Sequence, residues 1–291
     1  MRKMLSVILS AAILCFAFVG CDSEIQGTVS TNSMLETSAE STTTDTSALS
    51  GKLTLNGSTS MAKVCQALGE AFEAKYPGVT VEKAGTGSGD AAKAVRAGTA
   101  FIGDLSRNMK PEENPGDFEI VPIAIDGIAV AVNTDNKVSD LSSDQIAKIF
   151  TGEITNWKDV GGDDRKITVL GREAASGTRD GFESIFKCEK KCKYAAELSS
   201  TGEVVNKVGS DKGAIGYVSL DSLNNSIKAV DIDHVKANEE NIVNGTYKAQ
   251  RPFIEIYKKN TDSDLVKAWF AFVKSEEGKA VIKKAGLVTV Q

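Results

Sequence analysis

Three turns rich in Ser, Thr and Gly each follow a short apolar run and precede a helical pattern. They span residues 57–60, 85–89 and 176–178. A strand-to-helix turn of this kind exposes the free backbone N–H groups of the helix N-terminus, which attract anions. One such turn would indicate only an ordinary helix cap. Three of them, with Arg107 and Arg172 close by in sequence, predict an α/β protein that binds a small tetrahedral oxyanion.

The segments around the first two turns alternate between strand and helix patterns. Apolar strand patterns fall at residues 53–55, 79–81 and 100–102, and helical patterns at 60–76 and 90–97. Short apolar strands joined by helices predict a parallel sheet that is covered on both faces.

Two longer extended runs divide the chain. Residues 120–132 read as a crossover into a second lobe, and residues 252–257 read as the return. Between these two runs we expect helices at 143–150 and 176–186 and strands at 167–170 and 214–218. After the second run we expect a closing helix at 264–284. The sequence therefore predicts lobe 1 from residues 51–127 plus 249–291 and lobe 2 from residues 128–248. Ligands favour the cleft between two such lobes.

The N-terminus has the features of an export signal. Arg2 and Lys3 precede the apolar run 5–20, which is short for a membrane span, so residues 1–20 read as a signal peptide. Cys21 follows Phe18-Val19-Gly20, which resembles a bacterial lipobox and predicts lipidation of Cys21; cleavage elsewhere, with Cys21 incidental, is the alternative. Residues 22–50 contain 14 Ser or Thr, five acidic and no basic residues. Residues 21–50 are therefore expected to be the lipidated cysteine and a disordered tether.

The charge and the histidine and cysteine content argue against a nucleic-acid-binding or metal-binding protein. The net charge is −5, and the acidic tether accounts for most of it, so a nucleic-acid-binding surface is not expected. His234 is the only histidine and no Cys pair has zinc-finger spacing, so no metal site is expected. Cys65 reads as a buried thiol. Cys188 and Cys192 are candidates for a disulfide in an exported protein, subject to geometry.

Several motifs in their order along the chain resemble the phosphate-binding lipoproteins that supply bacterial ABC-type phosphate importers. They are LTLNGSTSM at 53–61, GTGSGD at 85–90, IGDLSR at 102–107, DGIAVAVN at 126–133, IFTGEITNWKDVGG at 149–162 and GREAASGTRDGF at 171–182. The resemblance implies the two-lobed periplasmic-binding-protein fold of the type II kind. It also implies inorganic phosphate as ligand, a membrane permease and an ATPase as partners, a lipid anchor on the outer face of the cytoplasmic membrane, and no cofactor.

The resemblance also implies which residues contact the ligand. By position these are Ser58, Thr59, Ser60, Ser88, Arg172, Ser176, Gly177 and Thr178. The best-known branch of the family has an aspartate in the loop after the third strand. This chain has Ser106 and Arg107 there and resembles a second branch, in which Arg107 is expected to supply a second guanidinium and Ser106 a hydroxyl.

A carboxylate that accepts the phosphate proton would discriminate phosphate from sulfate, which has no proton to donate. Asp126, an isolated acid in the apolar crossover, is the first candidate. Asp104 is the second, although a solvated loop position is the simpler interpretation for it. We expect Asp126→Asn to retain the fold and to blur the discrimination.

Other functions have weaker support. GTGSGD lacks the Gly-Lys-Ser/Thr of a P-loop, and Ser176 has no nucleophile elbow, so the sequence does not favour an enzyme. Binding of sulfate, molybdate or tungstate, and a sensor or adhesin that uses the fold without transport, remain alternatives. Trp157 reads as a packing anchor, and Arg179 as one partner of a salt bridge.

Overall fold

The computed structural model describes residues 49–290. The predicted signal peptide, Cys21 and nearly all of the predicted tether lie outside the described residues. Within residues 49–290, no helix is both long enough and apolar enough to cross a membrane.

The first strands and helices form a parallel α/β unit, as predicted. The strands are β1 (Ser50–Gly57), β2 (Gly78–Gly85) and β3 (Ile102–Leu105), in the order β2-β1-β3. The connecting helices are α1 (Ala62–Lys75), which follows the short 3-10 turn η1 (Thr59–Met61), and α2 (Ser88–Ala97). The turns that follow β1, β2 and β3 therefore lie at the same edge of the sheet.

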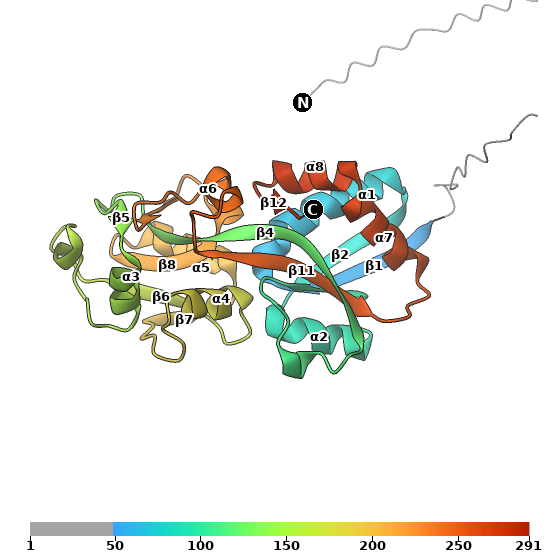
Figure 1. The fold of residues 1–291 in the computed structure, drawn as a ribbon, viewed down its shortest axis with the longest axis horizontal. Helices are drawn as coiled ribbons and strands as arrows, with labels where there is room; N and C mark the ends of the chain where they lie inside the picture. Colours follow the sequence, from blue (N-terminus) through green and yellow to red (C-terminus); the bar gives the residue numbers. More distant parts are fainter. Residues whose placement is uncertain (1–48, 291) are drawn as a thin grey trace, which may run out of the picture. The chain divides into compact units, whose positions relative to one another are not determined.

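Two long strands connect this unit to the rest of the molecule (Figure 1). Strand β4 (Phe118–Asn133) is 16 residues long, and β11 (Gln250–Lys258) runs antiparallel to its first part. The second part of β4 pairs with β8 (Ala214–Ser219). The sheet order is thus β2-β1-β3-β11-β4-β8-β6-β7. The two predicted crossovers are confirmed as β4 and β11.

The second half is another α/β unit, built on the second part of β4. Its sheet adds β6 (Thr168–Arg172), β7 (Ala196–Leu198) and β9 (Ile227–Ala229), while β5 (Asp140–Leu141) pairs with β10 (Asp231–Ile232) and β12 (Val288–Thr289) pairs with β4. Its helices are α3 (Ser143–Phe150), α4 (Gly177–Ile185), α5 (Thr201–Ser210) and α6 (Glu239–Val243). Further 3-10 turns are η2 (Pro111–Glu113), η3 (Trp157–Val160) and η4 (Leu220–Ser222).

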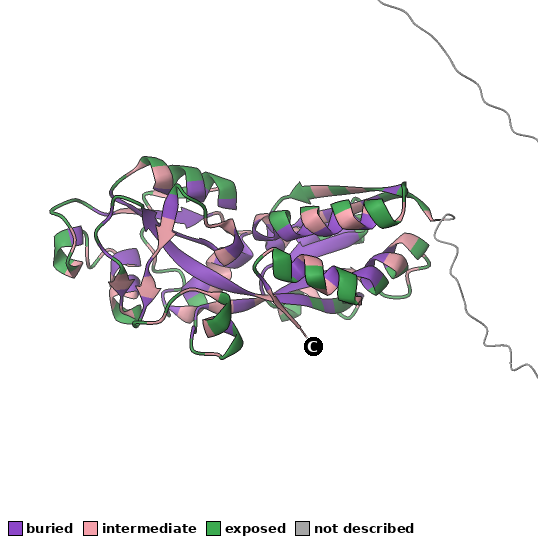
Figure 2. Ribbon diagram, turned by 90° about the horizontal axis from the view of Figure 1, so that it is seen from above, coloured by how far each residue is buried: buried purple, intermediate pink, exposed green. Residues whose placement is uncertain are grey.

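Each half has its own hydrophobic core. The largest cluster of the first half contains Phe72 from α1 and Trp269 from α7 (Asp264–Lys274). The largest cluster of the second half contains Trp157, Phe150 and Phe182. Figure 2 shows the central strands largely buried and the outward faces of the helices exposed. Trp157 is 1 % exposed and its indole N–H donates to the Gly213 carbonyl at 3.0 Å, so it is the packing anchor that was expected.

The single closing helix predicted at 264–284 is wrong. It is two helices, α7 (Asp264–Lys274) and α8 (Glu276–Lys284), separated at Ser275. Ser275 has an extended backbone (φ −69°, ψ 163°), and its hydroxyl oxygen accepts from the Gly278 N–H as the cap of α8. The apolar periodicity continues across the break because both helices contribute buried side chains to the same hydrophobic cluster.

Candidate functional site

Hydroxyl groups from three loops of the first half meet at the carboxyl edge of the sheet. Ser58 lies at the start of η1, Ser88 opens α2, and Ser106 follows β3. The Ser58 hydroxyl donates to Ser106 Oγ at 2.8 Å, and Ser88 Oγ lies 3.3 Å from Ser106 Oγ. All three side chains are at most 3 % exposed. The first two predicted turns and Ser106 therefore form one buried hydroxyl cluster.

The third predicted turn, from the second half, completes this cluster. Thr178 Oγ1 lies 2.5 Å from Ser60 Oγ, and Ser176 caps α4 through the Arg179 N–H. Position 177 requires glycine because the backbone there closely approaches the side chains of Ser88 and Ser106. A Cβ at this position would lie 2.4 Å from Ser88 Oγ and 2.7 Å from Ser106 Oγ. The N-termini of η1, α2 and α4 thus converge from both halves of the chain.

Arg172 is buried at the end of β6 and links the two halves. Its guanidinium donates to Thr59 Oγ1 at 3.0 Å and to Thr201 Oγ1 at 3.1 Å, and it forms a bidentate pair with Glu173. Its backbone N–H donates to the hydroxyl of Tyr217, which fixes the end of the strand. The structure therefore brings together Arg172 and Thr59, two of the residues predicted as ligand contacts.

Arg251 is a second guanidinium in the cluster that the sequence analysis missed. It lies on β11, is 4 % exposed, and donates to Thr178 Oγ1 at 2.7 Å and to the Ser106 carbonyl at 3.1 Å. Burial is the main cause that lowers the pKa of Arg251, and the charge of Arg172 acts in the same direction. An anion beside Arg251 would therefore stabilise its charged form.

A fourth turn was also missed. Ser200 caps α5, and the next residue, Thr201, lies 3.2 Å from both Thr59 Oγ1 and Ser60 Oγ through its own hydroxyl. The sequence Ser-Ser-Thr-Gly at 199–202 has the same composition as the three turns that were recognised. It follows a strand of only three residues, too short to be noticed as an apolar run.

Asp126 lies in the same cluster, one layer behind the hydroxyls. It is fully buried, and Arg251 donates to its Oδ2 from Nε at 3.1 Å and from a terminal nitrogen at 2.9 Å. Ser219 donates to the other oxygen at 2.6 Å. Burial raises the pKa of Asp126 to about 7, although the charge of Arg251 opposes the shift. Both carboxylate oxygens are therefore occupied by protein donors.

Arg107 and Asp104 do not lie where the sequence analysis expected them. The Arg107 guanidinium pairs with both oxygens of Glu113 at 2.6 and 2.8 Å and with Asp180 at 2.8 Å, so it is not brought into the hydroxyl cluster. The Glu113 carboxylate, supplied by η2, holds it away. Asp104 is not a solvated loop residue: it is fully buried in β3.

The remaining expectations concern side chains outside the cluster. Cys65 is 2 % exposed on α1, as expected for a buried thiol. Arg179 pairs with Glu183 at 2.8 Å, which confirms the expected salt bridge. The Sγ atoms of Cys188 and Cys192 lie 3.4 Å apart as free thiols, in a turn after α4. The disulfide stays a prediction.

Two guanidinium groups, several hydroxyls and the start of several helices thus face one another from two lobes. These groups bind oxyanions through charge-assisted hydrogen bonds. The fold and this site define a two-lobed solute-binding protein.

Comparison with known proteins agrees with this class. The model of the PBP superfamily domain matches residues 37–277. The phosphate-binding protein PstS of Bacillus subtilis (strain 168) is 32 % identical over 245 residues, which cover 83 % of this chain and 81 % of that protein. The chain belongs to the PBP superfamily and, within it, to the family of PstS phosphate-binding proteins.

Solved structures give the same result. A putative phosphate ABC transporter substrate-binding protein with bound phosphate from Clostridium perfringens superposes with a TM-score of 0.80 at 38 % identity, covering 83 % of this chain and all of that one. An ABC-type phosphate transport receptor from Vibrio cholerae has a TM-score of 0.67 at 32 % identity, covering 82 % of this chain and all of that one. The predicted fold class is confirmed.

Proposed function

We propose that this protein binds inorganic phosphate and delivers it to an ABC-type importer. One observation carries the proposal: Arg172 and Arg251 approach a single group of buried hydroxyls that comes from both lobes. The names of the relatives in Bacillus subtilis and Clostridium perfringens support phosphate as the ligand.

The proposed phosphate ligands combine predicted residues with two additions from the structure. They are Ser58, Thr59, Ser60, Ser88, Ser106, Arg172, Ser176, Gly177 and Thr178, with Thr201 and Arg251. Hydrogen bonds to a charged group contribute ~1.5–3 kcal/mol each, and micromolar affinity requires ~8 kcal/mol. Four or five well-directed bonds are therefore enough. A closed pair of lobes would exclude water and strengthen them.

We propose that Asp126 acts through Arg251 instead of touching the anion. Its oxygens already accept from Arg251 and Ser219, so its contribution would be to fix the guanidinium. Asp126→Asn retains one acceptor oxygen for Arg251, and its NH2 group can donate to the Ser219 hydroxyl, but the negative charge is lost. The variant should weaken phosphate and sulfate binding by the same factor in calorimetry. A selective gain of sulfate affinity would instead favour the direct proton acceptor that the sequence suggested.

The cellular setting follows from the N-terminal sequence and belongs to the same proposal. Residues 1–20 direct export, lipidation of Cys21 anchors the protein to the outer face of the cytoplasmic membrane, and residues 21–50 tether it. Lobe 1 comprises residues 51–127 and 249–291, and lobe 2 residues 128–248. The partners are the permease and ATPase of the importer, and no catalytic step is proposed.

Calorimetric titration of the purified protein tests the ligand. Bound anion is first removed by partial unfolding and refolding, and phosphate and then sulfate are added. The proposal predicts micromolar or tighter phosphate binding without heat from sulfate. Heat from sulfate, molybdate or tungstate alone would preserve the architecture and replace the ligand; no binding of any oxyanion would favour a sensor or adhesin.

A further inference from the structure

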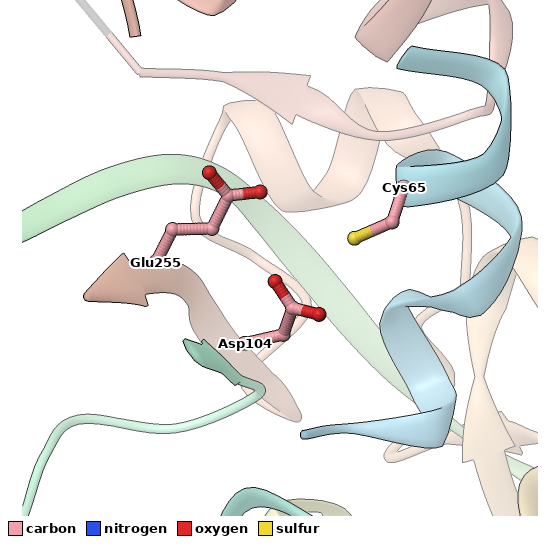
Figure 3. Close-up of side chains that lie close together, drawn as sticks. All are labelled: Cys65, Asp104 and Glu255. Carbon is pink, nitrogen blue, oxygen red and sulfur yellow. The ribbon is translucent and has the colours of Figure 1, made fainter. Parts of the chain in front are cut away.

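Three potential metal ligands lie together in the first half of the chain, outside the proposed phosphate site. They are the thiol of Cys65 on α1 and the carboxylates of Asp104 on β3 and Glu255 on β11. One ligand atom from each lies within 4.8 Å of the other two, and all three residues are at most 2 % exposed. Figure 3 shows the thiol and both carboxylates directed into the same space.

Strand register explains why two acids meet here. Glu255 and Asp104 are directly opposite each other in the antiparallel pair of β11 and β3. Like charges in such a position destabilise a sheet, and buried carboxylates need partners. A feature that is costly to fold suggests a role for the pair.

Each carboxylate has one oxygen bound and one without a partner. Lys83 donates to Asp104 Oδ2 at 2.5 Å, and the Trp269 indole N–H donates to Glu255 Oε2 at 2.7 Å. Asp104 Oδ1 and Glu255 Oε1 are buried, and neither accepts a hydrogen bond from any group within residues 49–290. These two oxygens, with the Cys65 thiol, are the free ligand atoms of the cluster.

The charges also match a divalent cation. With Cys65, Asp104 and Glu255 ionised, the cluster carries three negative charges, and the Lys83 ammonium leaves a net of two. A bound divalent cation would neutralise these two charges, and its ligation displaces any proton that the thiol or a carboxyl group holds.

A groove between α1 and β2 borders the cluster on the side of Cys65, whereas Asp104 and Glu255 lie behind its lining. The groove is about 410 Å³ in volume and is lined by Cys65 and Lys83, with Glu70 and Glu73 beside them. The two additional carboxylates make its lining acidic on balance, which favours the approach of a cation.

We propose that Cys65, Asp104 and Glu255 bind a divalent cation of the zinc class. Ligation forms bonds from the metal to Cys65 Sγ and to one oxygen of each carboxylate, and it releases to solvent any proton that these groups hold. A thiolate with two carboxylates suits a borderline ion such as Zn²⁺ or Co²⁺ better than Mg²⁺ or Ca²⁺, which take oxygen ligands only. Ligands of a tetrahedral ion with bonds of ~2.0–2.3 Å are ~3.3–3.7 Å apart, so side-chain shifts of about 1 Å would close the site.

Cobalt is the probe, because a thiolate bound to Co²⁺ absorbs in the near ultraviolet. Cys15, Cys21, Cys188 and Cys192 are first changed to serine, so that Cys65 is the only thiol. The protein is stripped of phosphate and metals and titrated with Co²⁺ in phosphate-free buffer. The proposal predicts one equivalent bound, a thiolate-to-cobalt band, its displacement by Zn²⁺, and tighter binding as pH rises. No band, from protein that still binds phosphate, would overturn it.

Two variants in the same background locate the site. Cys65→Ser should abolish the band, and a band that survives this change would overturn the proposal. Glu255→Gln retains Cys65 and an acceptor for Trp269, and it is expected to weaken Co²⁺ binding at least tenfold. Asp221→Asn, at a buried acid elsewhere in the chain, is the matched control and should leave Co²⁺ affinity unchanged. Equal affinity in Glu255→Gln and Asp221→Asn would contradict the assignment.

Discussion

Antiparallel register sets the two most important charged contacts at the scale of single residues. On β4 and β11, Asp126 lies directly opposite Arg251, and on β3 and β11, Asp104 lies directly opposite Glu255. The first pair has opposite charges and places a guanidinium among the site hydroxyls. The second pair has like charges and is buried. One strand, β11, therefore positions both a proposed phosphate ligand and a proposed metal ligand.

The pair of acids makes the stability of the fold depend on pH. The pKa of Glu255 rises from its ordinary value near 4.5 to about 8 in the fold, mainly through burial. Between these values the folded state holds a proton that the unfolded state has lost, so the free energy of unfolding falls as pH rises; the stabilisation is complete below the lower value and gone above the upper one.

Glu255→Gln should remove the part of this dependence that Glu255 causes, while Asp126, whose pKa is also raised by burial, keeps its own part in both proteins. The variant's free energy of unfolding, measured with a denaturant and a chelator present, should fall less steeply than that of the wild type between about pH 5 and about pH 7, by at most ~1.4 kcal/mol per pH unit. The exposed change Glu82→Gln is the control. If both variants retain the wild-type slope, Glu255 is not the titrating group.

At the scale of elements, helix N-termini build the site. The turns before η1, α2, α4 and α5 supply its hydroxyls, and Ser caps at residues 58, 176 and 200 fix where three of these elements begin. The same chemistry separates α7 from α8, where Ser275 also donates to the Phe272 carbonyl at 2.6 Å. Capping residues thus determine both the site and the end of the fold.

Ser275→Ala tests the capping role away from the site. Loss of the cap should lower the free energy of unfolding by about 1 kcal/mol, because the Gly278 N–H loses its acceptor. Phosphate affinity should not change. Lys279→Ala, at a partly exposed position of α8, removes only an ion pair with the exposed Glu276 and should change stability by less than about 0.5 kcal/mol. Equal stability of the two variants in thermal unfolding would show that the Ser275 cap does not stabilise α8.

At the scale of the whole folded unit, contacts between the lobes surround the site. Asp180 on α4 pairs with Arg107 at 2.8 Å and Lys110 at 2.9 Å, and Lys63 donates to the Asp221 carbonyl at 2.8 Å. The Gly89 N–H donates to the Ala175 carbonyl at 2.9 Å. Arg107, expected as a ligand, is in this arrangement a link between lobes.

Asp180→Asn should weaken that link. Because the ion pairs are partly solvated, the expected cost is modest: phosphate affinity falls about two- to fivefold, mostly through faster dissociation measured by stopped flow. Asp135→Asn is the control. It removes the ion pair between Asp135 and Lys212, which has a similar length (2.6 Å) but is more exposed than the pairs of Asp180. This variant should match the wild type. The same rate of phosphate dissociation in both variants would contradict a link between the lobes at Asp180.

Much of the fold could be predicted from sequence because periodicity and turns are local signals. The parallel strands, the two crossovers and the three turns were all found this way. Arg251 was not, because it lies within a strand without a nearby turn motif, and only the register of β11 against β4 brings it to Thr178. Arg107 was misplaced for the converse reason: it follows β3 near the site, but Glu113 competes for its guanidinium.

The central claim is that Arg251, and not Arg107, is the second guanidinium of the phosphate site. Calorimetric phosphate affinities of Arg251→Lys and Arg107→Lys test it most directly, since lysine retains a cation beside Asp126 or Glu113 and loses only the planar fork. We predict a loss of roughly 10- to 100-fold for Arg251→Lys and at most about fivefold for Arg107→Lys. Equal losses, or a larger one for Arg107→Lys, would contradict the account.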